Sequence, residues 1–465
     1  MVLQSFRDPA GSVTVQPDRV LRCLNERGAA ELDAFLKSKT LEALRCSIVE
    51  TRPAGSLAVE HPKVWFPSYP YEWPAEMLHA AGELTLDLAI RLLDEGWGLK
   101  DATPYNVLFE GPRPIFVDVC SFERRQTGDQ IWQAYGQFAR TFLNPLIANR
   151  HLRLPVEALL FATRDGIESE QLYHWTPWLK RWFSPLLLAV TLPALLAKSA
   201  LRSPNRKGGT AENRGIGAPP PLRAGLSSEA TQAEWVLRHL LTGLRRKLAA
   251  AKPATVSQTR WPDYMQTFTY SPAQFEFKSK FVQDALATLH PQRTLDVGCN
   301  TGYFSKLAAK AGSRVIAIDR DAAVVGRLWI EAAQESLDIQ PLIADFARPT
   351  PATGWRNAEC ASFLARADDA FDLAFLLGTL HHLTVTDRVP MAEVLEQTAT
   401  VASHAIIEYV DPEDEMFRLL SRGNEHLYRD YTDKAFKQAC QARFEILRQI
   451  QVPHSQRRLY LLRRR

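Results

Sequence analysis

The chain has 465 residues, 46% of them hydrophobic, which is enough for two or three globular domains. The 56 lysines and arginines nearly balance 52 acids, and a net charge of +4 argues against the broad basic surface of a general nucleic-acid-binding protein. The six cysteines form no CxxC pair, which argues against a disulfide framework and a zinc site and fits a reducing, cytoplasmic compartment.

Membrane insertion is not expected. The N-terminus "MVLQSFRDPAGSV" lacks the basic and apolar segments of a secretion signal. The most apolar window, residues 184–200, holds two prolines and is shorter than the roughly 20 residues of a membrane span. We expect a core helix there.

The first informative segment follows a predicted long helix at residues 74–96. In "GLKDATPYNVLFEGPRPIFVDVCSFE", Asp101 precedes Asn106, and Asp118 follows a strand-like run. This spacing resembles the catalytic loop and metal-binding acid of the protein-kinase and aminoglycoside-phosphotransferase fold. The resemblance implies that Asp101 takes the acceptor's proton, while Asn106 and Asp118 hold magnesium.

The kinase-like pattern is incomplete, and the similarity covers residues 60–150. Leu99 stands where that family has histidine, and Cys120 stands where many kinases have glycine. Residues 1–70 contain neither a convincing glycine-rich loop nor a strand lysine. Three interpretations therefore stay open: a small-molecule kinase, a degenerate kinase-like fold that presents substrate, and a coincidental loop and hairpin.

Residues 201–232 mark the clearest break in the chain. They are rich in glycine, proline, serine and charge, and cannot bury enough apolar surface to offset their ordering entropy. We therefore predict an N-terminal α+β domain over 1–200, a flexible linker over 201–232, and a second domain over 233–465 that begins with a helix at 233–250.

The second domain alternates predicted strands and helices from about residue 255 onward. Short β-branched runs flank a helical "GYFSKLAAKAG", and the last two runs resemble an antiparallel hairpin. This order predicts an α/β fold with a doubly wound, mostly parallel sheet. The predicted strands are "RTLDVG", "SRVIAID", "IQPLIADF", "AFDLAFLLG", "ASHAIIEYV", "RFEILRQI" and "RRLYLLRR".

A glycine turn follows the first of these strands in "LDVGCNTGYFS". Gly298 and Gly302 allow the backbone to approach a ligand closely, and Asn300 tolerates a positive φ better than most residues. Such a turn alone is weak support for a cofactor site, because dinucleotide folds use similar glycines.

Three acids at strand ends narrow the ligand class. Asp296 lies inside the turn motif, where it would repel pyrophosphate but could help to hold a cationic amino-acid group. Asp319 ends the second strand, where a carboxylate can accept both ribose hydroxyls. Asp345 follows the third strand, within reach of an adenine amino group. A nicotinamide enzyme would lack the inner acid.

The turn and its acids resemble the class I S-adenosylmethionine-dependent methyltransferases over roughly residues 260–465. The resemblance implies a Rossmann-like fold, S-adenosyl-L-methionine as cofactor, and substrate-facing groups after the fourth strand. That position holds "LLGTLHHLTVTDR", so His381 and His382 are candidates for a general base, with His382 slightly preferred.

Several rim segments are candidates for substrate binding. An insertion between Asp345 and the fourth strand and a loop after the fifth strand lie at the carboxyl ends of strands, where such folds bind ligands. A segment before the first helix could close over the cofactor. The candidates are Tyr270, Lys278, Trp355, Arg356, Asn357, Glu408 and Tyr409.

The whole chain is similar to bacterial methyltransferases with a kinase-like N-terminal segment, a group with nodulation-protein-like members. "KDATPYNVLF", "PIFVDVCSFE" and "YTDKAFKQAC" carry this similarity. It implies a methyltransferase for a small-molecule or glycan-like acceptor. The alternatives are a tRNA methyltransferase that uses the C-terminal arginines, a bifunctional kinase-methyltransferase, and a non-catalytic cofactor-binding protein.

Overall fold

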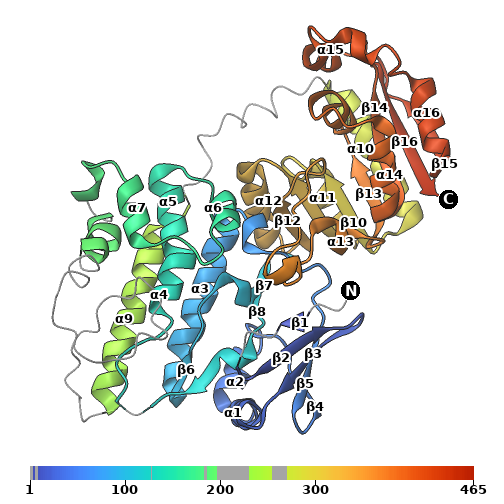
Figure 1. Cartoon of the computed structure of the whole chain (residues 1–465). Helices are drawn as coiled ribbons and strands as arrows, with labels where there is room; N and C mark the ends of the chain where they lie inside the picture. The colour runs from blue at the N-terminus through green and yellow to red at the C-terminus, as the bar shows by residue number, and fades with distance from the viewer. Residues whose placement is uncertain (1–3, 6–8, 127, 183–185, 196–229, 254–269) are drawn as a thin grey trace. The chain divides into compact units, whose positions relative to one another are not determined.

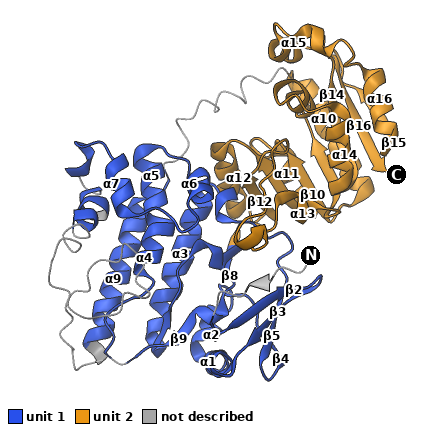
Figure 2. Ribbon diagram, in the orientation of Figure 1, with its two compact units in different colours: residues 1–109, 114–255 blue, residues 110–113, 256–465 orange. Residues whose placement is uncertain are grey.

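The computed structural model describes residues 4–5, 9–126, 128–182, 186–195, 230–253 and 270–465 (Figure 1). The chain divides into two compact units (Figure 2). Unit 1 comprises residues 1–109 and 114–255, and unit 2 comprises residues 110–113 and 256–465. Most of the predicted linker lies outside the described residues, and so do both ends of the predicted core helix at 184–200. Within the described part, no helix is long and apolar enough to cross a membrane.

Unit 1 begins with a five-stranded antiparallel sheet in the order β1-β2-β3-β5-β4, which the sequence analysis did not predict. Its central strand β3 alternates exposed and buried side chains, with Cys23 exposed and Leu24 buried. Such alternation is typical of a sheet with one covered face. The strands are β1 (Gln4–Ser5), β2 (Gly11–Val15), β3 (Arg19–Leu24), β4 (Arg52–Gly55) and β5 (Ala58–Pro62).

Helices form the rest of unit 1, together with two short strand pairs, β6-β9 and β7-β8. The long helix α3 is confirmed where it was predicted. The helices are α1 (Glu26–Leu36), α2 (Lys39–Leu44), α3 (Ala75–Leu92), α4 (Tyr135–Phe138), α5 (Asn144–Leu152), α6 (Val156–Ala162), α7 (Ser169–Trp175) and α9 (Ala230–Ala250). The short strands are β6 (Trp97–Leu99), β7 (Val107–Glu110), β8 (Arg113–Phe116) and β9 (Phe122–Arg124).

Helix α9 is part of unit 1, although the predicted second domain starts at residue 233. Its apolar face, which includes Leu241 and Leu248, is buried, and α9 packs along α3. His79 of α3 also contacts the Leu248 carbonyl oxygen at 3.2 Å through its Nε2 atom. The apolar stripe of this helix is therefore buried within unit 1, and the main segment of unit 2 begins after residue 255.

Unit 2 contains a seven-stranded sheet in the order β12-β11-β10-β13-β14-β16-β15. All seven predicted strands are confirmed, and so is the C-terminal antiparallel hairpin. The strands are β10 (Arg293–Val297), β11 (Arg314–Asp319), β12 (Ile339–Ile343), β13 (Phe371–Leu376), β14 (Ala402–Val410), β15 (Phe444–Gln451) and β16 (Arg457–Arg464). The first five are parallel to one another, whereas β16 is antiparallel to both β14 and β15.

The strand order reverses beside β10, and this reversal positions the site. The chain runs from β10 outward to β11 and β12, then returns to pair β13 with the other side of β10. Right-handed crossovers in opposite directions place helices on opposite faces and leave a crevice at the carboxyl ends of β10 and β13. The helices are α10 (Pro272–Leu289), α11 (Tyr303–Lys310), α12 (Ala322–Gln334), α13 (Phe363–Ala367), α14 (Met391–Val401), α15 (Glu415–Ser421) and α16 (Asp433–Gln441).

Two glycines of unit 2 provide a matched test of backbone strain. Gly302 has φ +76°, and a Cβ there would lie 2.2 Å from the buried side chain of Leu328. Gly312 has φ +96° but no atom within 4 Å of such a Cβ. We expect Gly312→Ala to cost about 1 kcal/mol of stability from backbone strain, and Gly302→Ala to cost about 1 to 3 kcal/mol more from overpacking.

Thermal unfolding of the two variants measures this difference. The expected order of midpoints is wild type, Gly312→Ala, then Gly302→Ala. Equal midpoints for the two variants would show that Leu328 does not require a glycine opposite it.

Candidate active site

A pocket lies at the predicted crevice of unit 2, between the turn after β10 and the segment after β13. Its lining includes parts of α10, both strand-end segments and two residues near α15 and β16. The lining residues are Tyr270, Phe275, Lys278, Asp296, Gly298, Cys299, Asn300, Thr301, Tyr303, Phe304, Leu377, Gly378, His381, His382, Met416 and Arg457. Of the residues singled out from the sequence, Tyr270, Lys278, Asp296, Gly298, Asn300, His381 and His382 meet here.

The turn after β10 has the left-handed backbone that its sequence predicted. Gly298, Asn300 and Gly302 have φ angles of +70°, +49° and +76°. At Gly298, a Cβ would lie 2.7 Å from Oγ1 of Thr379, which donates a hydrogen bond to the Val297 carbonyl oxygen at 2.9 Å. Glycine is thus required for packing within the protein as well as for an open path to the pocket.

Asp296 is a buried acid at the pocket floor, with 3% of its surface exposed. Its Oδ2 accepts a hydrogen bond of 2.6 Å from the Ser305 hydroxyl in α11. Burial raises the pKa of Asp296 to about 6; the hydroxyl of Ser305 opposes this shift, and the neighbouring Asp319 adds to it. Ionising this carboxylate is costly unless a cation enters the pocket.

Asp319 ends β11 and is tied to the same turn. Its two carboxylate oxygens accept backbone hydrogen bonds of 3.0 Å each from Asn300 and Asp321. Asp345 follows β12, and one of its oxygens accepts the Ala347 backbone N–H at 2.9 Å. The structure thereby fixes the orientation of two acids at adjacent strand ends, as predicted. Neither acid contributes to the pocket lining itself.

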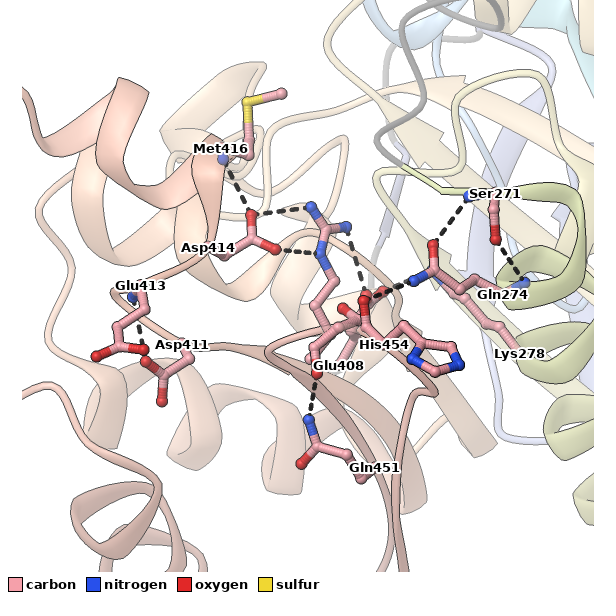
Figure 3. A network of polar contacts seen from close by, with 12 residues as sticks. Ser271, Gln274, Lys278, Glu408, Asp411, Glu413, Asp414, Met416, Gln451 and His454 are labelled. Atoms are coloured by element: carbon pink, nitrogen blue, oxygen red, sulfur yellow. Dashed lines mark hydrogen bonds and ion pairs between the residues drawn. The ribbon is translucent and has the colours of Figure 1, made fainter.

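A buried ionic network forms one side of the pocket (Figure 3). Lys278 of α10 lies 2.5 Å from Oε2 of Glu408 in β14, and both side chains are buried. Arg457 of β16 lies 3.6 Å from the other Glu408 oxygen and donates to Asp414 at 2.8 and 3.0 Å. Burial lowers the pKa of Lys278 to about 7 and raises that of Glu408 to about 7.

The two histidines after β13 line the pocket with uncharged rings. His381 is 2% exposed, and neither ring nitrogen has a hydrogen-bond partner among the described residues. Burial lowers its pKa well below the usual value, and His382 lowers it further. Burial and then Arg320 also lower the pKa of His382. The lowered pKa values favour neutral rings near pH 7, and they make both rings weaker bases than a free imidazole.

Five of the seven rim candidates are absent from the pocket lining. Tyr409 is fully buried in the core and stacks on Tyr431. Its neighbour Glu408 points the other way, because successive side chains of a strand face opposite sides of the sheet. Glu408 faces the network instead. The short helix η9 contains Trp355, Arg356 and Asn357, and its Trp355 is 58% exposed.

The structure brings together two of the three kinase-like residues in unit 1. Asn106 donates to Asp118 across 3.5 Å, and Asp118 also accepts the Ser121 hydroxyl. The other oxygen of Asp118 lies 3.0 Å from the buried guanidinium of Arg22. Asp101 follows β6 and is partly buried. Arg22 was not predicted from the sequence, because the kinase resemblance implies a strand lysine at this place and not an arginine.

The magnesium that the kinase resemblance implies does not fit this arrangement as it stands. Arg22 already neutralises Asp118, and a divalent cation needs that carboxylate as an oxygen ligand. Across the described residues, no three His, Cys, Asp or Glu side chains gather in one place, so a magnesium ion here would depend on Asp118 together with oxygen ligands from a bound nucleotide.

Calorimetric titration of the full chain with ATP, with and without Mg²⁺, tests this conclusion. We expect no magnesium-dependent binding to the wild-type chain. Arg22→Gln should remove the competing charge, and Arg19→Gln provides a control on the same strand, because Arg19 pairs with Glu60 instead. Magnesium-dependent ATP binding to the wild type that Arg22→Gln weakens would show that Arg22 assists a nucleotide site.

Comparison with known proteins defines the family. A family model for a methyltransferase domain matches residues 270–447. Nodulation protein NoeA of Rhizobium meliloti (strain 1021) is 31% identical over 478 residues, which cover all of this chain and 96% of that protein.

The similar solved structures are more distant. WbdD, a bifunctional kinase-methyltransferase, is 17% identical with a TM-score of 0.32, over 45% of this chain and 43% of that chain. N-methyltransferase NodS from Bradyrhizobium japonicum WM9 is 15% identical with a TM-score of 0.31, over 42% of this chain and 97% of that chain. The family match confirms the predicted methyltransferase domain for residues 270–447, and the chain as a whole belongs to the family of nodulation protein NoeA.

Proposed function

We propose that the chain transfers a methyl group from S-adenosyl-L-methionine to a small-molecule or glycan-like acceptor. One observation carries this proposal. The buried Asp296 and the oriented Asp319 flank a single left-handed turn, and the Asn300 backbone N–H joins that turn to Asp319 at 3.0 Å. A carboxylate for a cationic group and a carboxylate for a diol, 23 residues apart in the sequence, are thereby connected through one turn at the carboxyl ends of β10 and β11.

The three strand-end acids suit different parts of the cofactor. Asp319 would accept the ribose hydroxyls, Asp345 would accept the adenine amino group, and Asp296 would lie nearest the methionine ammonium. When bound, the cofactor supplies an already activated methyl group on a sulfonium. The protein's remaining task is to align the acceptor and to exclude water.

The charges around the pocket favour a cationic ligand. Three buried or half-buried carboxylates, those of Asp296, Glu408 and Asp414, face two cations, Lys278 and Arg457. Fully ionised, this group has one surplus negative charge. In a low-dielectric pocket, a ligand with positive charge offsets that surplus, whereas a pyrophosphate would increase it.

Unsatisfied polar atoms indicate a polar acceptor. The ring nitrogens of His381 and the Tyr270 hydroxyl are buried without hydrogen-bond partners among the described residues, and both side chains line the pocket. Leaving such atoms unpaired costs about 1 to 3 kcal/mol each. An acceptor with hydroxyl, amine or amide groups would satisfy them, and neutral His382 could take the proton that such an acceptor releases.

A tRNA acceptor receives less support from the C-terminal arginines than the sequence suggested. Four of these five arginines are paired with acids of the same unit, and Arg465 donates to the Phe444 carbonyl oxygen. The ion pairs are Arg457 with Asp414, Arg458 with Asp433, Arg463 with Glu445 and Arg464 with Asp369. A kinase activity likewise receives less support, because Arg22 pairs with Asp118.

Loss of the proposed ribose carboxylate should weaken cofactor binding. We expect Asp319→Ala to reduce the affinity for S-adenosylmethionine at least tenfold in calorimetric titration, because hydrogen bonds to a charged acceptor contribute about 1.5 to 3 kcal/mol. Asp338→Ala is the control, since that exposed acid pairs only with Arg314 among the contacts resolved for it. Equal affinities for wild type and Asp319→Ala would remove the ribose assignment.

Cofactor affinity should also depend on pH. Folding raises the pKa of Asp296 to about 6, so the carboxylate gains a proton as the pH falls through 6 and can no longer offset a cation. We expect affinity to fall by about tenfold per pH unit below 6. The Asp296→Asn variant should bind S-adenosylmethionine weakly, and its affinity should lack the fall below pH 6. A wild-type affinity that is constant from pH 5 to 8 would contradict the role of Asp296.

Turnover should depend on the histidine that borders the pocket. We expect His382→Ala to lower the release of S-adenosylhomocysteine in a metabolite extract by about a hundredfold, typical of a lost general base, with cofactor affinity unchanged. His404→Ala is the control, because His404 bonds to Ser403 in β14 and is not a lining residue. Normal turnover in the His382→Ala variant would contradict a role in proton transfer and would show that His382 only packs against its neighbours.

A further inference from the structure

An exposed aromatic surface in unit 1 has no role in the proposed methyl transfer. It is formed by Trp175, Trp178, Leu179 and Trp182, which are 43%, 68%, 57% and 58% exposed. We call these four residues the tryptophan patch. Large apolar side chains this close together are unusual on a soluble surface and mark a place where something else binds.

The tryptophan patch is held in place by the fold. Arg181 donates from its Nε to the Thr176 carbonyl oxygen at 2.8 Å, and its guanidinium lies 4.1 Å from the centre of the Tyr173 ring. The Thr191 hydroxyl donates to the Arg181 carbonyl oxygen at 2.7 Å. Hydrogen bonds and a cation–π contact thus hold the backbone between Trp175 and Trp182, while the indole rings of this segment remain exposed.

The surroundings of the patch are basic. The sequence from His174 to Trp182, "HWTPWLKRW", contains Lys180 and Arg181 and no acid. Beside it is an open hollow whose apolar lining includes Leu154, Leu159 and Trp175. The polar side chains of that lining are His151, Arg153 and Lys180, with no carboxylate among the described lining residues.

We propose that the tryptophan patch docks unit 1 onto the surface of an anionic lipid bilayer. Tryptophan prefers the boundary between headgroups and acyl chains, where its apolar ring is buried and its N–H stays hydrated. Lysine and arginine beside it are attracted by anionic headgroups, which makes the attachment dependent on both apolar burial and charge. The patch would then lie in the plane of the membrane surface.

Co-sedimentation of the full chain with lipid vesicles tests this proposal. We expect binding to vesicles that contain phosphatidylglycerol, weaker binding to pure phosphatidylcholine, and partial loss as salt rises from 0.1 to 0.5 M. Trp178→Ser should reduce the partition coefficient, and the double variant Trp178→Ser/Trp182→Ser should reduce it at least tenfold. Trp235→Ser is the matched control, because Trp235 is 59% exposed but lies on α9, outside the patch.

Three outcomes would overturn the proposal. The wild-type chain could fail to sediment with anionic vesicles, or Trp235→Ser could lose as much binding as Trp178→Ser. The chain could instead be a dimer that the double variant converts to a monomer in light scattering, which would assign the patch to a second copy. Circular dichroism of each variant distinguishes lost binding from lost folding. An independent variant of the patch, Leu179→Ser, should also bind vesicles more weakly.

Discussion

The burial of charge beside β10 is the constraint on which the site depends. Asp296, Lys278, Glu408 and Arg457 come from α10 and three strands, and each is almost completely removed from water. Charges of this kind are tolerated only when they are paired and hydrogen-bonded. Because β16 lies beside β14 in the sheet, Arg457 is close enough to pair with Glu408, which also pairs with Lys278. The charge balance of the pocket therefore depends on the strand order of the sheet.

On the proposed function, the cofactor and the acceptor would contact different parts of this crevice. The acids at the ends of β10, β11 and β12 are fixed by backbone and hydroxyl donors before any ligand arrives. The segment after β13 instead contains buried His381, whose ring nitrogens have no hydrogen-bond partner among the described residues, and this would suit an acceptor that brings its own hydrogen-bonding groups. The acids at the ends of β10, β11 and β12 are thus preorganised, whereas the segment after β13 would obtain its hydrogen-bond partners from the substrate.

Local sequence predicted the fold of unit 2 well and parts of the site poorly. Runs such as "SRVIAID" combine β-branching with a turn signal, so their strands and the acids that end them could be located. The sequence left Lys278 open between a residue that closes over the cofactor and an exposed helix residue, and its buried pairing could not be predicted because its partner Glu408 is 130 positions away. Tyr409 was predicted at the rim but is buried in β14, because the sequence at the end of a strand does not indicate which side chains face the core. In unit 1, "RVLRCL" has too mixed a pattern to predict a central strand, and Arg22 was therefore overlooked.

The central claim is that the crevice beside β10 holds S-adenosylmethionine, and a crystal structure with S-adenosylhomocysteine tests it most directly. The account predicts ribose hydroxyls on Asp319, the adenine amino group beside Asp345 and the amino-acid end near Asp296. The pocket walls should retain the Lys278–Glu408 pair, since a buried pair is costly to break. Ligand density elsewhere on unit 2, or its absence at saturating concentration, would contradict the account.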